Sequence, residues 1–368
     1  MDLDPLLKQM VEQGASDLFL KVGNHPFLRI NGQLIPVGNG EERLHADDVT
    51  RIASELMGPH GRQTFHADRE LNFAFDRATI GRFRANVLWQ RGTMALVIRR
   101  VNRAIPSFEE LRLPAEVLAR LMGEPHGLVL ITGATGSGKS TTTAAMLQYV
   151  NQHVARHIVT LEDPIEFQYE EQRAIINQRE VGTDTRSFSE GLRNVLRQSP
   201  DILYLSDLRD RETMESALLA AEAGQLVLSC LHTTNATTTI ERIVAFFPSH
   251  QHQLIRLRLS QVLRGIVSLR LLAARQASGG GSGSGRVPAC EILLATPTMR
   301  DHIREGQTEL LPAAIHDGGM LGMQTLTQAL YALYRAGEVT LEEALRHADS
   351  PQDLQLMVKE IRATRDVH

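Results

Sequence analysis

The sequence predicts an α/β protein with two domains, because two patterns follow one another along its 368 residues. Up to about residue 105, short segments of alternating polarity lie between helical segments, which is typical of an α+β domain. From about residue 115, short apolar runs alternate with helical segments, which predicts a parallel sheet with crossover helices. We therefore expect a smaller α+β domain over residues 1–105 and a larger α/β domain over residues 106–368.

The first predicted domain consists of strands with interspersed helices. The pair Asn31-Gly32 is a hairpin turn signal between two of these strands. In chain order, the expected elements are a helix over 3–13, strands at 17–22, 27–30 and 33–37, a helix near 46–58, and strands at 70–76, 81–88 and 93–101.

The second predicted domain contains the buried runs of a parallel sheet, with enough residues between them for crossover helices. The runs lie at residues 128–131, 157–161, 201–205 and 225–231. The Ser/Gly tract 277–285 is predicted to be a flexible surface loop. Beyond Pro288 we expect mostly helix, with a C-terminal helical region over about 297–368 and one helix at 322–336. The apolar face of that helix carries Met323, Leu326, Leu330 and Leu333.

A phosphate-binding loop follows the first buried run, in the pattern G-x-x-x-x-G-K-[ST]. Its residues are Gly133, Ala134, Thr135, Gly136, Ser137, Gly138, Lys139 and Ser140, and Thr141 follows in the helix. Glycines let backbone N–H groups curl around phosphates, and the N-terminus of the following helix adds partial positive charge. Lys139 is expected to reach the β- and γ-phosphates, and the Ser140 hydroxyl to ligate Mg²⁺. The strand before and the helix after argue against a chance turn, so the sequence predicts nucleoside triphosphate binding.

Acidic and imidazole side chains follow the other buried runs. Glu162, Asp207 and His232 each stand directly after such a run or one residue further on. Ligands of open α/β sheets bind at the carboxyl ends of the strands, so we expect these side chains near the triphosphate and its metal. Two alternatives stay open: Glu162 could cap the next turn, and His232 could be a structural histidine.

Composition narrows the classes of function. A net charge of −4 shows no basic excess, so nucleic acid is not an expected partner. Cys230 and Cys290 are too few for a four-cysteine zinc site, and we expect two buried free thiols in a reducing cytoplasm. The N-terminus is not typical of a signal peptide, and no apolar run approaches membrane-spanning length. These features predict a soluble, cytoplasmic protein.

The order of further motifs carries a resemblance. After the phosphate loop come LEDPIEF (161–167), QREVG (178–182), LRQSPD (196–201) and LHTTN (231–235). In this order they resemble the secretion ATPase superfamily, and the chain is similar to its type IV pilus retraction ATPases, the PilT/PilU family. The similarity covers nearly the whole chain, and segments near the C-terminus, such as residues 322–325 and 348–350, look more like the PilU branch.

The resemblance implies a PAS-like N-terminal domain, a RecA-like P-loop ATPase domain, and ATP bound with Mg²⁺ between the two domains of a hexameric ring. It places Glu162 and Glu166 in an acidic motif where Glu162 is, or positions, the base for the attacking water. Asp207 would stand at the Walker B position as a further Mg²⁺ ligand, direct or through water. His232 would sense the γ-phosphate.

Two arginines complete the site that the resemblance implies. Arg84 and Arg99 match N-terminal-domain arginines that reach the phosphates from a neighbouring subunit. Read from the residues alone, these arginines could also belong to a solvated basic face.

The function implied is a motor that retracts type IV pili in twitching motility, at the cytoplasmic face of the inner membrane. Its partners would be an inner-membrane platform protein, which alone attaches it to the membrane, and a paralogous retraction ATPase. One alternative is a type II secretion or pilus assembly ATPase, although such proteins carry a longer N-terminal region and a four-cysteine zinc element. A second is a low-activity or non-hydrolysing accessory ring working with a paralogue. A nucleic-acid translocase is a third, which the balanced charge disfavours.

Two segments depart from the family pattern. Ser206-Asp207 replaces a Gly-Glu pair, and the shorter aspartate withdraws its carboxylate by roughly 1 Å. A misplacement of that size can cost about a hundredfold in rate, so we expect either a compensating shift of the strand end or a slow enzyme. Residues 298–304 replace an AIRNLIRE-type sequence, which weakens the expected link of this helix to retraction.

Overall fold

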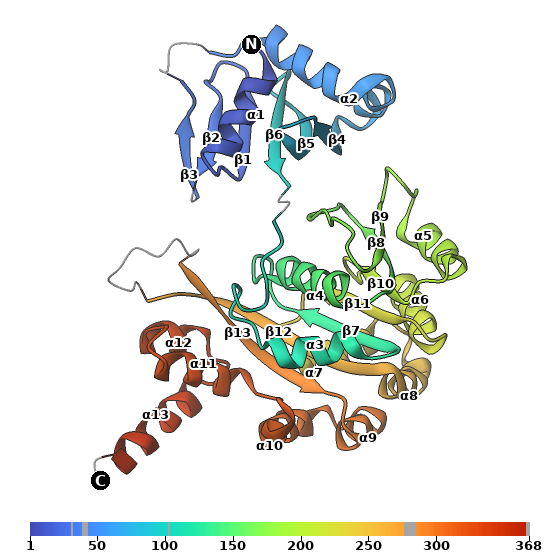
Figure 1. Cartoon of the computed structure of the whole chain (residues 1–368), viewed down its shortest axis with the longest axis vertical. Helices are drawn as coiled ribbons and strands as arrows, with labels where there is room; N and C mark the ends of the chain where they lie inside the picture. The colour runs from blue at the N-terminus through green and yellow to red at the C-terminus, as the bar shows by residue number, and fades with distance from the viewer. Residues whose placement is uncertain (31, 39–42, 102–103, 276–284, 366–368) are drawn as a thin grey trace. The chain divides into compact units, whose positions relative to one another are not determined.

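The computed structural model describes residues 1–30, 32–38, 43–101, 104–275 and 285–365 (Figure 1). The chain divides into two compact units, residues 1–104 with 166–168, and residues 105–165 with 169–368. Asn31 of the expected hairpin signal and nearly all of the Ser/Gly tract 277–285 lie outside the described residues.

The first unit is built on an antiparallel sheet in the order β3-β2-β1-β6-β5-β4 (Figure 1). Its strands are β1 (Asp17–Lys21), β2 (Phe27–Ile30), β3 (Gln33–Pro36), β4 (Glu70–Arg77), β5 (Gly81–Gln90) and β6 (Thr93–Arg100). Helix α1 (Leu3–Glu12) packs on β1, and α2 (Ala46–Asp68) packs on β4 and β6. Apolar residues from both helices and the sheet form one core, with Leu7, Leu18, Ile52 and Phe83 fully buried.

Helix α2 extends ten residues beyond the segment 46–58 that the pattern predicts. Gly58 leaves the helical region with a φ of 61°, and Pro59 follows it. Because proline cannot continue a helix but is tolerated where one begins, α2 is two helical segments that meet at a kink. The sequence pattern therefore located the first segment and missed the second.

The second unit is built on a sheet in the order β13-β12-β7-β11-β10-β8-β9, which is parallel apart from the antiparallel pair β12 and β13 (Figure 1). Its strands are β7 (Gly127–Thr132), β8 (His157–Glu162), β9 (Ile175–Glu180), β10 (Ile202–Leu205), β11 (Leu226–Leu231), β12 (Leu263–Ala273) and β13 (Arg286–Leu294). The predicted buried runs are β7, β8, β10 and β11, and they pair in parallel as expected. The predicted α/β fold class is confirmed. Beyond Pro288 the chain is mostly helical, as expected, but first completes strand β13, which runs on to Leu294 and was not predicted.

Helices cover this sheet and continue past it to the C-terminus (Figure 1). They are α3 (Ala115–Gly123), α4 (Lys139–His153), α5 (Phe188–Val195), α6 (Arg211–Glu222), α7 (Ala236–Ala245), α8 (His252–Val262), α9 (Pro297–Glu305), α10 (Leu311–Asp317), α11 (Leu326–Arg335), α12 (Leu341–His347) and α13 (Pro351–Arg365). Helices α4 and α6 both pack on β7 and β11, the strands at the centre of the sheet. None of the described helices is long and apolar enough to cross a membrane.

The C-terminal helices have a smaller core of their own on β12 and β13. Leu326 and Leu330 of α11 are buried there against Leu272 and Val287. Met323, which the pattern placed on the same helical face, precedes α11 and packs into the main core of the unit. The helix begins later than expected because the Thr325 side chain caps it by accepting a hydrogen bond from Gln328 N.

Both cysteines are buried free thiols, as the sequence predicts. Cys230 lies on β11 and Cys290 on β13. Burial raises the pKa of the Cys290 thiol to about 12. Because the thiolate is the reactive form, this thiol is unreactive near neutral pH.

Candidate functional site

The phosphate loop joins the buried strand β7 to helix α4, as its motif predicts. Gly133, Gly136 and Gly138 have φ angles of 143°, 81° and 97°, which L side chains rarely adopt. A Cβ at Gly133 would lie 2.5 Å from the Leu269 carbonyl oxygen and 2.4 Å from Ser137 Oγ. The loop backbone therefore passes close to β12, and only glycine fits there.

Lys139 is the first residue of α4, and its side chain folds back over the loop. Its Nζ donates hydrogen bonds to the carbonyl oxygens of Gly133 at 2.7 Å and Ala134 at 3.0 Å. The residue is only 8% exposed, so a positive charge is buried inside the loop. Buried charge needs strong polar partners, and phosphate oxygens meet that need.

A buried hydroxyl also fits a phosphate ligand. Ser137 Oγ is buried and has no hydrogen-bond partner within the described part of the chain. A polar group left in this state is costly unless a ligand or ordered water satisfies it. Ser140 and Thr141, the next hydroxyl residues of the motif, are half-buried at the start of α4. The loop is thus chemically suited to bind phosphate and, through Ser140, Mg²⁺.

The carboxyl ends of β10 and β11 bring two predicted residues together beside this loop. His232 Nδ1 lies 3.4 Å from Lys139 Nζ, and its Nε2 lies 3.5 Å from Asp207 Oδ2. The imidazole therefore connects the loop lysine to the carboxylate. Asp207 is 8% exposed, whereas the His232 side chain is more than half exposed and accessible to a ligand.

Arg209 is a neighbour of this group that sequence reasoning missed. Its Nε donates to Asp207 Oδ2 at 2.8 Å, and its Nη1 lies 3.3 Å from Asp163 Oδ2. The hydrogen bond to Asp207 is the main reason that the pKa of Arg209 is raised. The sequence offered only a weak indication of its role, since an arginine two residues after a strand-end carboxylate belongs to none of the motifs in this chain.

Glu162 lies in a buried polar network at the end of β8. Its Oε1 accepts hydrogen bonds from Thr160 Oγ1 at 2.6 Å and Gln178 Nε2 at 3.1 Å. The residue is 5% exposed. Burial, with a smaller contribution from Glu162, raises the pKa of Tyr204 well above its usual range. The geometry shows a well-held carboxylate, and its role as a base stays a prediction.

The turn after β8 is held by a different carboxylate. Glu180 on β9 is buried, and its Oε2 accepts a hydrogen bond from Ile165 N at 3.1 Å. Its Oε1 accepts from the Thr183 hydroxyl at 3.3 Å. Sequence reasoning quoted Glu180 only as part of a motif and gave it no role.

The remaining predicted residues belong to the first unit. Arg84 on β5 and Arg99 on β6 are directly opposite each other in the antiparallel register. Arg99 Nε donates to Asp17 Oδ1 at 2.8 Å, and Asp17 itself is buried. Glu166 is exposed and is grouped with this unit. The structure therefore presents the two arginines as one basic pair, whose contact with phosphate stays a prediction.

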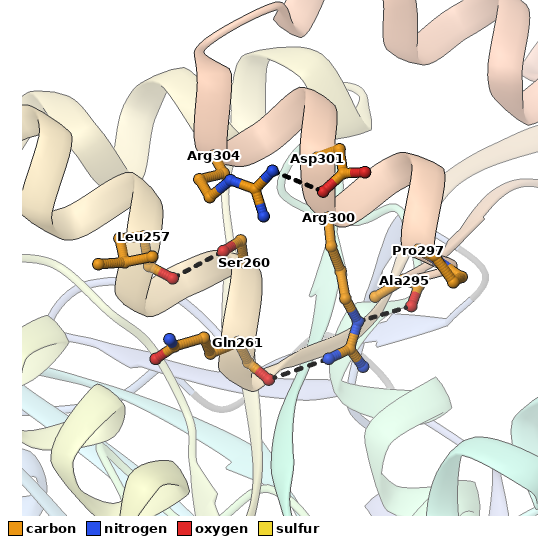
Figure 2. Close-up of a pocket in the computed structure, with 8 residues that line it drawn as sticks. All are labelled: Leu257, Ser260, Gln261, Ala295, Pro297, Arg300, Asp301 and Arg304. Carbon is orange, nitrogen blue, oxygen red and sulfur yellow. Dashed lines mark hydrogen bonds and ion pairs between the residues drawn. The ribbon is translucent and has the colours of Figure 1, made fainter.

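A separate pocket lies between α8 and α9, away from these residues in sequence (Figure 2). It has a volume of about 440 Å³. Arg300 donates to the carbonyl oxygens of Ala295 and Gln261, and Arg304 pairs with Asp301 at 2.8 Å. The arginines of segment 298–304 thus bond within α9, to Ala295 two residues before it, and to the end of α8.

Comparisons with known proteins agree with this architecture. A sequence model of the family described as Type II/IV secretion system protein matches residues 1–346. The chain is 42% identical over 359 residues to the type IV pilus ATPase PilU of Pseudomonas aeruginosa, covering 98% of this chain and 92% of the relative. It is 40% identical over 353 residues to the type IV pilus retractation ATPase PilT of the same organism, covering 96% and 100%.

A solved structure extends the comparison to three dimensions. The pilus retraction motor PilT with bound ADP superposes with a TM-score of 0.88 at 41% identity, covering 96% of this chain and 99% of that one. The resemblance to the PilT/PilU proteins, including the PilU-like character, is confirmed. With the family match spanning nearly its whole length, the chain belongs to the Type II/IV secretion system protein family.

Proposed function

We propose that this protein is an ATPase of the PilT and PilU kind, a hexameric motor that powers type IV pilus retraction and twitching motility. The observation that carries the proposal is the chain of contacts from Lys139 through His232 to Asp207, beside a complete phosphate loop. Relatives that match nearly the full chain are named as a pilus ATPase and a pilus retractation ATPase. A related motor was solved with ADP bound.

In this proposal each residue acts by position and charge. The loop amides and Lys139 hold the phosphates, and Ser140 and Asp207 hold Mg²⁺. The metal, when bound, neutralises charge that develops on the phosphates during hydrolysis. His232 reports on the γ-phosphate, because its ring lies between Lys139 and Asp207.

The remaining roles concern the attacking water and the neighbouring subunit. Glu162, with Glu166 in the same segment, accepts the proton of the water or positions it. Its fixed hydrogen bonds to Thr160 and Gln178 support the positioning role. Arg84 and Arg99 reach the phosphates of an adjacent subunit; they lie opposite each other across β5 and β6, and Arg99 is already paired with Asp17.

The partners and location follow from the same proposal. The ring acts at the cytoplasmic face of the inner membrane on a platform protein of the pilus machine, with a paralogous retraction ATPase as a further partner. The retraction class is favoured over an assembly or secretion class because the sequence has two cysteines, too few for a four-cysteine zinc element.

A second candidate function is a low-activity accessory ring. It is favoured by the contacts of Asp207, whose short carboxylate is already paired with Arg209 at 2.8 Å. A carboxylate held this way is less available to a metal ion.

Steady-state ATP turnover with Mg²⁺ tests the proposal directly. We expect clear turnover by the full chain and its loss in Lys139→Ala and Glu162→Gln. Lys139→Ala removes the positive charge that holds the phosphates, and Glu162→Gln removes a base. Lys8→Ala, on helix α1, is the control that keeps turnover. Absence of turnover in the parent, with ATP still bound, would leave the accessory ring as the function.

A further inference from the structure

The carboxylate of Glu291 on β13 meets the starts of two helices. Its Oε1 accepts a hydrogen bond from Ala236 N at 2.7 Å, and it lines one pocket with Leu326, whose backbone amide lowers the pKa of Glu291. Ala236 is the first residue of α7, and Leu326 is the first residue of α11. One half-buried side chain thus lies at the starts of two helices that are 90 residues apart in the chain.

The physical reason for this arrangement is the charge at helix ends. The first amides of a helix have no partner within it and carry partial positive charge. A carboxylate between two such ends is attracted to both and offsets the repulsion between them. Burial raises the pKa of Glu291, and the backbone amides of Ala236 and Leu326 oppose that rise.

On one side, the contact leads to the candidate nucleotide site. Helix α7 begins four residues after His232. Thr239 Oγ1 donates to the Asn235 carbonyl oxygen at 2.6 Å and lies 2.6 Å from Thr233 Oγ1. These bonds tie the His232 segment to the first turn of α7, so a displacement of His232 is passed on to Ala236.

On the other side, the contact leads to the C-terminal helices. Gln324 pairs with Ile292 through backbone hydrogen bonds of 2.8 and 3.2 Å, and its side chain donates to the Cys290 carbonyl oxygen at 2.8 Å. The residues flanking Glu291 on β13 therefore hold the segment that enters α11. Leu326 and Leu330 then carry α11 into the C-terminal core.

Space beside Glu291 allows the helix starts to move. A pocket of about 500 Å³ lies there, lined among others by Asn235, Thr237, Thr325 and Gln328. A close-packed contact would resist a shift of one helix start against the other, whereas a hydrogen-bonded contact beside a pocket permits it.

We propose that Glu291 is a positioning residue that couples the His232 segment to the C-terminal helices, so that nucleotide binding at His232 changes the placement of α11. This inference rests on the proposed function, since it requires a nucleotide at the phosphate loop. According to this inference, the C-terminal helices respond to the nucleotide state of their own subunit.

Hydrogen exchange of the full-length protein, with and without Mg²⁺ and the slowly hydrolysed analogue ATPγS, tests the coupling. In the parent we expect slower exchange in the loop, and altered exchange at the starts of α7 and α11. In Glu291→Ala the loop and α7 keep their responses, while the response at α11 falls about tenfold, because the carboxylate between the two helix starts is lost. Glu343→Ala is the matched control, since Glu343 holds α12 to β12 through Ala273 N without contacting α7, and it keeps all three responses.

A second variant keeps the test valid where Glu291→Ala fails to fold. Ala236→Pro removes the α7 donor but leaves the carboxylate, and proline is favoured at the first position of a helix. Asn235 is extended, as the residue before proline must be. An α11 response of parental size in either folded variant overturns the inference, as does a parent whose loop responds while α11 does not. A parent whose loop does not respond overturns nucleotide binding, and the inference with it.

Discussion

The Asp207 carboxylate is shared between two nitrogen-bearing side chains. Arg209 Nε donates to it from 2.8 Å, and His232 Nε2 lies 3.5 Å away. Because aspartate is one methylene shorter than glutamate, its reach towards a metal depends on how Arg209 orients it. Asp207 therefore determines whether the ring hydrolyses ATP at the rate of a motor or slowly.

The substitution Asp207→Glu tests that decision. We expect turnover to rise about tenfold or more, because the longer side chain restores roughly 1 Å of reach towards the phosphates. The measurement is kcat under saturating ATP and Mg²⁺, with Asp301→Glu on the exposed face of α9 as the control that leaves kcat unchanged. Unchanged or lower turnover would mean that the strand end already fits aspartate.

At this scale the sequence predicted part of the site. Lys139, Asp207 and His232 could be placed together because strand ends of a parallel sheet meet at one edge. Arg209 and Glu291 could not be placed, because their partners are near them only in the folded structure and no residue spacing along the chain predicts these contacts. The sequence motif also could not show that Glu162 is held by Gln178 from β9.

The phosphate loop is the element in which backbone geometry limits substitution most clearly. Gly133→Ala is expected to destabilise the protein by about 2 kcal/mol or more, because the new Cβ meets a backbone carbonyl at 2.5 Å. Gly136→Ala is the matched control: its Cβ enters open space, so it costs only the strained φ, about 1 kcal/mol. Urea unfolding without nucleotide measures both, and equal losses would contradict the close approach to β12.

Helix α12 is attached to β12 by a carboxylate that titrates. Glu343 Oε1 accepts from Ala273 N at 2.9 Å, and this bond is the main reason that its pKa lies below the usual 4.5. Since the folded pKa is depressed, the stabilisation is present above pH 4.5 and is lost as the pH falls through the folded value. We expect Glu343→Gln to lose less stability than the parent below pH 4.5 in urea unfolding. Glu342→Gln, at an exposed neighbouring position, is the control and should leave the dependence of the free energy of unfolding on pH unchanged. The same pH dependence in all three proteins would refute the attachment.

Element boundaries show where sequence patterns stop being informative. The buried strands β7, β8, β10 and β11 could be predicted because each is short and mainly apolar. Strand β9 was missed since it lies at the sheet edge with polar residues and an exposed Ile175. Periodicity alone also extended α11 back to residue 322, because it cannot see that Thr325 caps the helix.

The whole molecule contains separate apolar cores in its two units. The single tryptophan, Trp89, stacks on Phe65 within the first unit at 6.0 Å between ring centroids. Its fluorescence therefore reports unfolding of the first unit, while circular dichroism reports both.

This separation predicts how a nucleotide acts on stability. ADP with Mg²⁺ at about 100 times its Kd should stabilise the second unit by about 2.7 kcal/mol, because it binds only the folded phosphate loop. The transition seen by circular dichroism then shifts upward by more than the Trp89 fluorescence transition, because in the proposed ring the first unit contributes Arg84 and Arg99 only to the nucleotide of a neighbouring subunit. Lys139→Ala is the control that abolishes the shift, and a parallel shift of both signals would show that the units unfold as one.

The two buried thiols have a practical consequence for following motion in this protein. Cys230 and Cys290 are shielded inside the second unit, so the native surface offers no competing cysteine. A cysteine introduced at an exposed position, such as Leu356 on α13, becomes the selective point of attachment for a dye or spin label. Distances between labelled helices can then be followed through an ATP cycle without first removing native residues.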